Sequence, residues 1–457
     1  MEAQNAVDIL MSKGKAAVEA VKDYDQKRID CLVRAIGKAV YDNAQILAEI
    51  AVNETGYGKL ESKVVKNRRT SMAAWSFLKD KKSTGVIEED LEKNLVTIAK
   101  PAGVVACITP TTNPTATIVV NCMHVLKGKN AAIVSPHPKS KVASIETVNL
   151  LRNAIAQLGA PADLIQIVEE PSTELTQSIM RNADVVVATG GASMVKAAYS
   201  SGKPSFGVGQ GNVQVVIDEN FTDYEYIADQ TIGNRIYDNG MPCTGEQAIF
   251  VPEKHKAEII AAFENNGAYH VSDKSDVEKF RENVFNEKGI IRKELFGQPA
   301  HVVGEVVGVE VPRSAGLLLV EVEKFAEEEI LSKEILCPIV KLYTYEKFED
   351  AVAGAKKNLL MEGAGHSAVI YSNDDDRVNY FAEEIPVCRI DVNVSAVAGS
   401  GSPYNSGMEP TMSNGCGFWG NNSISGPLTY RHLLNYTNVI REIPDVVPPT
   451  PEEVWEM

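Results

Sequence analysis

The sequence contains few of the residue patterns that mark metal-binding, disulfide-stabilised or secreted proteins. Its seven cysteines lie singly along 457 residues, at positions 31, 107, 122, 243, 337, 388 and 416, and no CxxC pair occurs. This argues against a disulfide framework or a zinc ribbon, and the seven histidines show no HxxxH or similar metal spacing. Free thiols suit a reducing cytosol. Residues 1–20 also lack the apolar core of a signal peptide, so we expect a cytoplasmic protein without a bound metal.

Long apolar runs and an excess of positive charge are missing too. No hydrophobic stretch approaches the length that spans a bilayer. Lys and Arg number 45 against 61 Asp and Glu, which gives a formal net charge of −16, and no long basic run appears. Nucleic acid and anionic membranes are therefore poor candidates for the main partner, although a local pocket could still bind anionic small molecules. The length and the hydrophobic content of 44% indicate a globular chain of two or three domains.

Short strands rich in valine and isoleucine alternate with helices through the middle of the chain. Before them, residues 1–52 carry apolar side chains at helical spacing, which predicts two or three amphipathic helices. Strands are predicted at 94–100 and 103–109, and the alternating part that follows predicts strands at 130–135, 164–168, 184–188 and 213–217 and helices at 141–158, 173–182 and 193–201. This order is typical of an α/β fold with a doubly wound parallel sheet, in which ligands bind at the carboxyl ends of the strands.

A second α/β set follows, and we expect the boundary between the two near 220–240. Its first helix is predicted at 224–237, and its strands at 248–251, 317–322, 338–343, 367–371 and 389–394. The last segment, 428–441, is predicted to be partly helical.

Glycine, proline, serine and threonine crowd the ends of three predicted strands, in TPTTNP (109–114), SPHPKS (135–140) and ATGGAS (188–193). The glycines of the last loop would let a phosphate approach the start of the following helix. That loop is not GxGxxG, so the usual dinucleotide-binding fingerprint is absent. In the first loop, Asn113 could donate its amide to an oxyanion on a substrate carbonyl, or could simply be a turn asparagine before proline.

Cys243 lies in the loop DNGMPCTGEQ (238–247), between a predicted helix and a predicted strand. The flanking glycines and proline can leave a thiol accessible and close to backbone N–H groups, and both conditions favour a nucleophilic thiolate. A buried structural cysteine is the other interpretation. The loop alone does not decide between them.

Seven motifs occur together in one order: KPAGVVACITPTTNPTAT, LKGKNAAIVSPHPKS, DVVVATGGASMVKAAYSSGKPSFGVGQGN, YDNGMPCTGEQ, KEILCPIV, EGAGHSA and GCGFWGNNSIS. With them the chain resembles the aldehyde dehydrogenase superfamily, and specifically its coenzyme-A-acylating branch. That branch includes acylating succinate-semialdehyde dehydrogenases and the aldehyde dehydrogenase half of bifunctional aldehyde–alcohol dehydrogenases.

The resemblance implies a division of the chain into three parts. A nicotinamide cofactor-binding domain would comprise 1–93 and 107–225, and a catalytic domain 226–425. A small oligomerisation element would comprise 94–106 and 426–457. As in relatives, this element implies a homodimer or a dimer of dimers.

The resemblance also implies roles for single residues. Cys243 would attack the aldehyde, Asn113 and the Cys243 backbone N–H would hold the oxyanion, and hydride would pass to a nicotinamide cofactor. Glu334 matches a glutamate that binds the nicotinamide-side ribose, and a surface helix glutamate is the alternative. The remaining cofactor residues implied are Thr109, Pro110, Thr111, Ser135, His137, Pro138, Gly190, Gly191 and Ser193.

Two departures from the hydrolytic branch bear on the co-substrates. Hydrolytic members carry a glutamate general base in the segment that matches FGVGQGN (206–212), where this chain has no carboxylate. Without a base to activate water, the acyl-enzyme should wait for the thiol of coenzyme A (CoA). Ser135 and Pro138 replace the Lys and Glu that bind the adenosine ribose in many hydrolytic members. NADP is therefore possible beside His137 and Lys139, although we favour NAD.

The resemblance leaves other points open. His366, in GAGHS, could deprotonate CoA, line the pocket or be structural, whereas Cys337 and Cys416 are expected to pack. The loop 394–408 is expected to line the aldehyde site. We expect a small C2–C4 aldehyde, with succinate semialdehyde first and sulfoacetaldehyde or acetaldehyde as alternatives. The competing functions are hydrolytic oxidation to the free acid and a non-catalytic binding protein.

Overall fold

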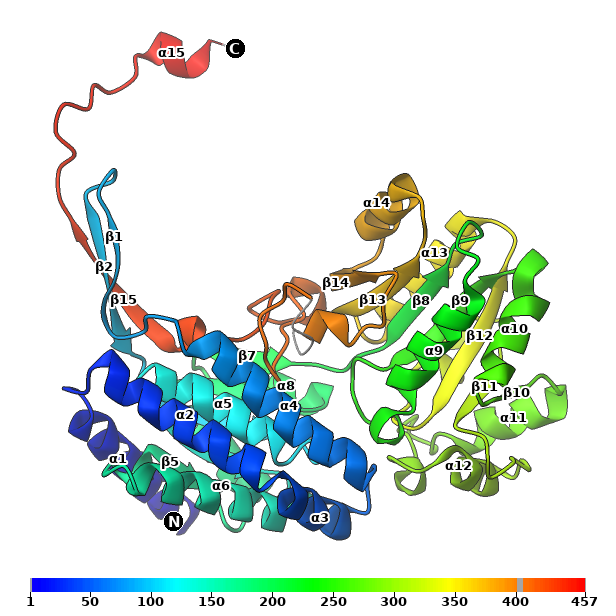
Figure 1. Cartoon of the computed structure of the whole chain (residues 1–457), viewed down its shortest axis with the longest axis horizontal. Helices are drawn as coiled ribbons and strands as arrows, with labels where there is room; N and C mark the ends of the chain where they lie inside the picture. The colour runs from blue at the N-terminus through cyan, green and yellow to red at the C-terminus, as the bar shows by residue number, and fades with distance from the viewer. Residues whose placement is uncertain (1, 401–405, 457) are drawn as a thin grey trace.

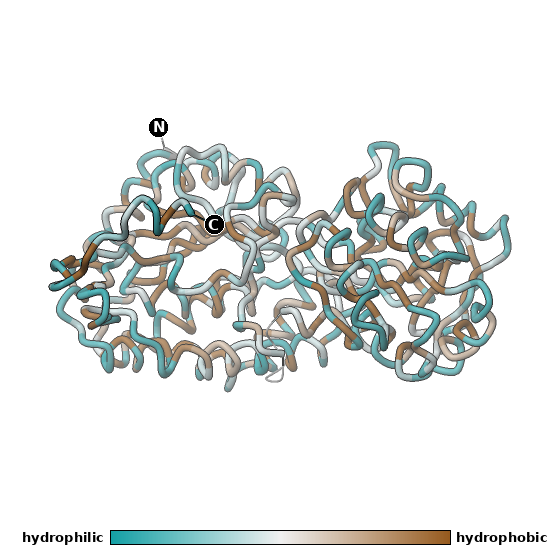
Figure 2. Tube along the Cα trace, turned by 90° about the horizontal axis from the view of Figure 1, so that it is seen from above, coloured by the Kyte–Doolittle hydropathy of each residue, from teal (hydrophilic) through white to brown (hydrophobic). Residues whose placement is uncertain are grey.

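The computed structural model describes residues 2–400 and 406–456. Two α/β bodies lie side by side, and a small antiparallel sheet extends from the first of them (Figure 1). Seen from above, the two bodies meet at a narrow waist (Figure 2). Within the described residues, no helix is long and apolar enough to cross a membrane.

The first body is built on a five-stranded parallel sheet in the order β5-β4-β3-β6-β7. Its strands are β3 (Val104–Thr109), β4 (Ala131–Pro136), β5 (Ile165–Ile167), β6 (Val185–Thr189) and β7 (Ser205–Val208). Its helices are α1 (Glu2–Ala20), α2 (Gln26–Asp42), α3 (Ala44–Thr55), α4 (Leu60–Leu78), α5 (Ala116–Lys127), α6 (Lys141–Ala156), α7 (Thr173–Asn182) and α8 (Ala192–Tyr199). Every residue of β3 and β4 is buried, as expected for central strands covered on both faces.

Helix α4 is unusual because its buried face is largely polar. The polar residues buried along it are Lys63, Lys66, Asn67, Thr70 and Ser71, at spacings of three and four that place them on one side. The apolar periodicity that reveals α2, whose buried residues include Ile29, Leu32 and Ile36, is therefore absent from α4.

The second body is built on a seven-stranded parallel sheet in the order β10-β11-β12-β9-β8-β13-β14. Its strands are β8 (Val213–Ile217), β9 (Glu246–Pro252), β10 (Ala268–Val271), β11 (Leu317–Glu321), β12 (Ile339–Tyr345), β13 (Gly365–Tyr371) and β14 (Val387–Val392). Its helices are α9 (Tyr224–Arg235), α10 (Lys256–Asn265), α11 (Lys274–Asn283), α12 (Ala300–Val307), α13 (Phe348–Met361) and α14 (Asp375–Glu384). Two hydrophobic clusters form the core of this body.

The strand pairing corrects one expectation. From the sequence we grouped 213–217 with the first sheet, but β8 pairs with β9 and β13 in the second. The first sheet therefore ends at β7, before the boundary expected at 225. Local sequence shows that a segment is a strand, whereas its choice of sheet depends on partners distant along the chain.

A three-stranded antiparallel sheet joins distant parts of the chain, in the order β1 (Gly85–Asp90), β2 (Leu95–Pro101) and β15 (Leu434–Ile440). Residues 104–106, which we had assigned to this element, instead begin β3. The segment predicted to be partly helical has a short 3-10 turn at Tyr430–Leu433 and then becomes strand β15. Beyond it, the chain runs away from both bodies to a short helix, α15 (Pro451–Trp455) (Figure 1).

Two parallel sheets with helices on their faces confirm the predicted α/β class. They also bring the end of the first sheet close to the loop that carries Cys243, because Gly211, three residues after β7, lies against Cys243.

Candidate active site

The turn before Cys243 is held in an uncommon backbone conformation. Asp238, Asn239 and Gly240 have φ angles of 50°, 52° and 75°, in the left-handed region that Asp, Asn and Gly tolerate best. A Cβ on Gly240 would lie 2.7 Å from the carbonyl oxygen of Cys337. Glycine is therefore needed where the turn passes the 335–339 segment, and the DNG sequence explains the sharp path from α9 into the Cys243 loop.

The fully buried Arg235 holds this loop in place through hydrogen bonds. Arg235, at the end of α9, donates to the carbonyl oxygens of Gly240 (3.3 Å), Cys337 (2.7 Å) and Ile339 (3.1 Å), and also to that of Ile335. Because these carbonyls belong to two separate segments, Arg235 ties the nucleophile loop to the segment that carries Glu334.

Cys243 and His366 meet in the structure. The Nε2 of His366, on β13, lies 3.3 Å from the Sγ of Cys243. Burial, with a contribution from Arg389, lowers the pKa of His366 to about 3. Burial and the nearby Glu334 raise the pKa of Cys243 to about 12, although part of Cys243 stays exposed. Both shifts favour a neutral thiol beside a neutral imidazole, whose Nε2 faces the thiol.

His366 is fully buried, and a cation lies near it. Its Nδ1 is buried and has no hydrogen-bond partner among residues 2–400 and 406–456. Arg389, on the neighbouring strand β14, donates to the Ser367 hydroxyl (3.2 Å) and the Gly415 carbonyl (2.8 Å). Its positive charge disfavours imidazolium formation and favours the Cys243 thiolate, but burial outweighs the second effect.

The 206–212 segment lies against the nucleophile. A Cβ on Gly211 would lie 2.1 Å from the carbonyl oxygen of Cys243, so only glycine allows this approach. The Gly211 N–H donates to the Glu334 carboxyl at 3.0 Å, and the Gln210 amide donates to Glu362 at 3.3 Å. This segment places Gly211 against the nucleophile loop and the Gln210 amide against Glu362, and neither residue carries a carboxylate.

Glu334 is not the surface helix glutamate that we considered as an alternative. It lies in a loop before β12 and is only 8% exposed. Its backbone N–H donates to Glu362 at 2.6 Å. Burial and repulsion from Glu362 raise the pKa of Glu334 to about 8, so its protonated form is favoured at neutral pH. Such a carboxyl can both donate to and accept from hydroxyl groups.

The residues expected around a cofactor lie at the carboxyl ends of three adjacent strands. The register pairs Thr109 of β3 with Pro136 of β4, and Ile108 with Ala188 of β6. Pro110 and Thr111 follow β3, His137 and Pro138 follow β4, and Gly190, Gly191 and Ser193 lead from β6 into α8. The structure therefore gathers these predicted residues along one edge of the sheet.

Two observations at this edge fit a bound nucleotide. The Thr109 hydroxyl is buried without a partner in the described chain, and a Cβ on Gly191, at the start of α8, would meet nothing within 4 Å. An unpaired donor and open space at a helix start suit a pyrophosphate. Ser135 is different, because its hydroxyl is buried and bonded to Thr176 at 2.8 Å.

The Asn113 side chain accepts a hydrogen bond from Lys66, a residue that we did not predict from the sequence. Its Oδ1 accepts from the Lys66 ammonium at 2.6 Å, and Lys66 also donates to Asp238 at 2.7 Å. The sequence offers one signal for each of these two residues. Lys66 lies among the polar residues spaced three and four apart on α4, and Asp238 lies five residues before Cys243.

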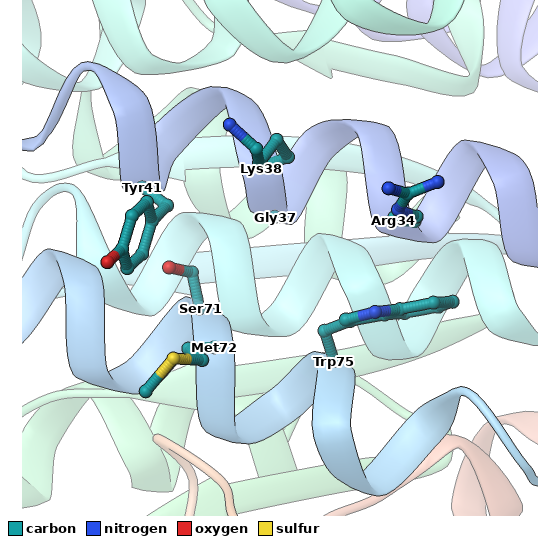
Figure 3. Close-up of a pocket in the computed structure, with 7 residues that line it drawn as sticks. All are labelled: Arg34, Gly37, Lys38, Tyr41, Ser71, Met72 and Trp75. Carbon is teal, nitrogen blue, oxygen red and sulfur yellow. The ribbon is translucent and has the colours of Figure 1, made fainter.

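Two further features lie outside this cluster. A surface groove of about 190 Å³ runs between α2 and α4 (Figure 3) and is lined by Arg34, Gly37, Lys38, Tyr41, Ser71, Met72 and Trp75, none of them a predicted site residue. In the described part of the chain, no three His, Cys, Asp or Glu side chains are grouped as metal ligands. Of the loop 394–408, residues 401–405 lie outside the described residues, while the Ala396 N–H donates to Glu246 at 3.0 Å.

Comparison with known proteins identifies relatives along the whole chain. The model of the "Aldehyde dehydrogenase family" matches residues 1–279. The "Succinate-semialdehyde dehydrogenase (acetylating)" of Clostridium kluyveri is 43% identical over 455 residues and covers 100% of both chains.

Two solved structures match the fold as well. An acetylating aldehyde dehydrogenase from Geobacillus thermoglucosidasius superposes with a TM-score of 0.93 at 32% identity, over 98% of this chain and 99% of that one. A Rhodopseudomonas palustris propionaldehyde dehydrogenase, with bound CoA and an acylated cysteine, superposes with a TM-score of 0.84 at 26% identity, over 95% and 97%.

Proposed function

This chain belongs to the aldehyde dehydrogenase family, among its CoA-acylating members, and we propose that it works through covalent intermediates on Cys243. The reaction would convert a small C2–C4 aldehyde, CoA and NAD(P)+ reversibly to acyl-CoA and NAD(P)H. The observation that carries the proposal is the contact between Cys243 and His366, 3.3 Å apart, beside a segment without a carboxylate.

In the first step, the Cys243 sulfur adds to the aldehyde carbon while His366 Nε2 accepts the thiol proton. The Asn113 amide and the Cys243 backbone N–H donate to the oxyanion of the resulting thiohemiacetal. The residues at the carboxyl ends of β3, β4 and β6 would hold NAD(P)+, which would supply the hydride acceptor. Loss of hydride from the thiohemiacetal carbon leaves an acyl thioester on Cys243, and His366 releases its proton to solvent.

In the second step, CoA replaces Cys243 on the acyl group. His366 Nε2, now free because the thiol it faced is acylated, accepts the proton of the CoA thiol. The CoA sulfur attacks the thioester carbon, and the Cys243 sulfur leaves and recovers its proton from His366. The energy of the thioester bond is retained, so the reaction can run in both directions.

Glu334 would hold the hydroxyls of the nicotinamide-side ribose, as its buried carboxyl beside Gly211 supports. NAD is our preferred cofactor. NADP is the alternative, because Pro138 offers no carboxylate to repel a 2′-phosphate. The nearby Lys139 ammonium, which could pair with that phosphate, instead donates to the Tyr57 hydroxyl at 3.3 Å. Steady-state rates with NAD+ and NADP+ at equal concentration would measure the preference.

Succinate semialdehyde is the proposed aldehyde, because the Clostridium kluyveri relative that bears its name is similar over the whole chain. Sulfoacetaldehyde and acetaldehyde are the alternatives. A panel of these aldehydes, assayed with CoA and each cofactor, should give the highest kcat/KM for succinate semialdehyde. A preference for acetaldehyde would exclude an anionic substrate.

The role of Cys243 can be tested by substitution. Cys243→Ala should abolish NADH formation and the acyl adduct that mass spectrometry detects on the wild-type enzyme without CoA. Cys31→Ala is the matched control, because Cys31 is exposed on α2 and should be dispensable. Full NADH production by Cys243→Ala would exclude the mechanism.

We further propose that the three-stranded sheet mediates a homodimer or a dimer of dimers. Strand β15 lies at the edge of this sheet and exposes Tyr436 and Ile440. Light scattering of the purified protein should show a dimer or tetramer, and Ile440→Lys should shift it toward the monomer.

A further inference from the structure

We propose that Lys66, held by Asp238, is a positioning residue that fixes the Asn113 carboxamide with its N–H facing the substrate oxygen. The proposal rests on the function proposed above, in which Asn113 donates to the oxyanion. It gives a role to Lys66, a buried cation on α4 that takes no part in the chemistry of Cys243 and His366.

Three segments meet at the Lys66 ammonium. Lys66 comes from α4 and is only 9% exposed. It donates to Asn113 Oδ1 at 2.6 Å, in the loop after β3, and to Asp238 Oδ2 at 2.7 Å, in the turn before Cys243. One ammonium group therefore connects the oxyanion donor with the turn that carries the nucleophile.

The chemistry of the ammonium group selects the orientation of the amide. An ammonium only donates hydrogen bonds, so the Asn113 atom facing Lys66 must be the carbonyl oxygen. The Nδ2 then points elsewhere, and it has no acceptor among residues 2–400 and 406–456. If Lys66 were removed, the amide could rotate and present its oxygen to an oxyanion, which it would repel.

Asp238 keeps Lys66 in place. Its fully buried carboxylate also accepts from the Lys63 ammonium at 3.1 Å and from the Lys59 backbone N–H at 2.9 Å. Two lysines share one carboxylate, so the cluster carries a net positive charge on the side of Asn113 opposite its free N–H. That charge polarises the amide in the direction that strengthens donation to a developing negative oxygen.

Lys63 provides the matched control. It is buried and bonded to the same carboxylate, but it makes no hydrogen bond to Asn113. A purely structural role would make the loss of either lysine similar in effect. A positioning role makes the loss of Lys66 specific to the step that Asn113 assists.

The test is a double-mutant cycle between Lys66→Met and Asn113→Ala, read as kcat and KM for CoA-dependent NADH formation. Losing one oxyanion donor lowers kcat by roughly 10²–10³-fold, so Lys66→Met should lower kcat by about 10-fold or more with little change in KM. In the Asn113→Ala background it should have almost no further effect, because the donor that it orients is gone. Lys63→Met should lower kcat much less, and Lys66→Arg should recover part of the loss.

Equal losses in both backgrounds, or equal losses from Lys63→Met and Lys66→Met, would overturn the proposal. If Lys66→Met does not fold, as judged by circular dichroism, the same cycle with Lys66→Gln gives the answer. A wild-type enzyme that forms no NADH from any aldehyde with CoA would reject the proposed function. An active wild type with independent Lys66 and Asn113 effects would reject this inference alone.

Discussion

Replacing Asp238 with Asn tests the buried charge cluster behind the nucleophile turn. Asp238 pairs with Lys66 at 2.7 Å and Lys63 at 3.1 Å, and all three side chains are at least nine-tenths buried. Removing one partner of a buried pair typically costs about 3–5 kcal/mol, because the other charge remains desolvated and unpaired. Burial and Lys66 already lower the pKa of Lys63 to about 8, so Lys63 should lose its proton once Asp238 is replaced, and the loss should reflect mainly the stranded Lys66 ammonium.

Thermal unfolding is the assay. For a body of 150–250 residues, each kcal/mol shifts Tm by roughly 2–4 °C, so a loss of about 3–5 kcal/mol should lower Tm by roughly 6–20 °C. Burial alone would raise the pKa of Asp238, but Lys66 and Lys63 outweigh it and hold that pKa below its usual value. The stabilisation is therefore present above the unfolded pKa of about 4 and is lost as pH falls through the lower folded pKa.

A surface variant and a compensating variant control the measurement. Asp42→Asn breaks the exposed pair with Lys38 and should change Tm by less than about 2 °C. Adding Lys63→Met to Asp238→Asn removes a buried amine that has lost its partner and should recover part of the loss. A Tm for Asp238→Asn within about 2 °C of the wild type would refute the reasoning, because the cluster would then be solvated.

Three further changes address the site itself. His366→Ala should lower the CoA-dependent kcat by about 10²–10⁴-fold, the usual contribution of a general base, and a loss below about 10-fold would contradict its role. Burial and Glu362 raise the Glu334 pKa to about 8, so its carboxylate fraction grows between pH 7 and 9. The Kd for NAD+ from fluorescence titration should fall over that range, and a Glu334→Gln variant that keeps the same pH dependence would exclude Glu334 as the cause. The same raised pKa also affects stability. The contribution of protonated Glu334 to the free energy of unfolding is fully present below its unfolded pKa and is lost as pH rises through about 8. Glu334→Gln should therefore raise Tm relative to the wild type at pH 9. Gly211→Ala places a Cβ 2.1 Å from the Cys243 carbonyl oxygen and should abolish activity, whereas Gly233→Ala, with nothing within 4 Å of its Cβ, should remain active in the same NADH assay.

Elements with strong local signals could be predicted from the sequence. Strands β3 and β4 are continuous runs of buried apolar residues, and α7 begins and ends where its apolar spacing and its Ser172 cap indicate. Strands β7 and β10, with the sequences SFGV and AYHV, are too short and too poor in branched residues to stand out. Helix α4 was missed because its buried face is polar.

The site was predictable where a motif carried it and not where distant segments meet. The loop around Cys243 and the strand-end turns are contiguous in sequence, so their residues could be named. Lys66 and Asp238 are separated by 172 residues, and no local pattern encodes their contact. The assignment of β8 to the second sheet was missed for the same reason.

The most direct test of the central claim follows NADH formation by the wild-type enzyme with aldehyde and NAD+, with and without CoA. Without CoA, the absence of a carboxylate in 206–212 predicts a burst of about one NADH per Cys243 and then no turnover. Adding CoA should start sustained turnover and release acyl-CoA. Equal sustained turnover without CoA, with free acid as the product, would contradict the account.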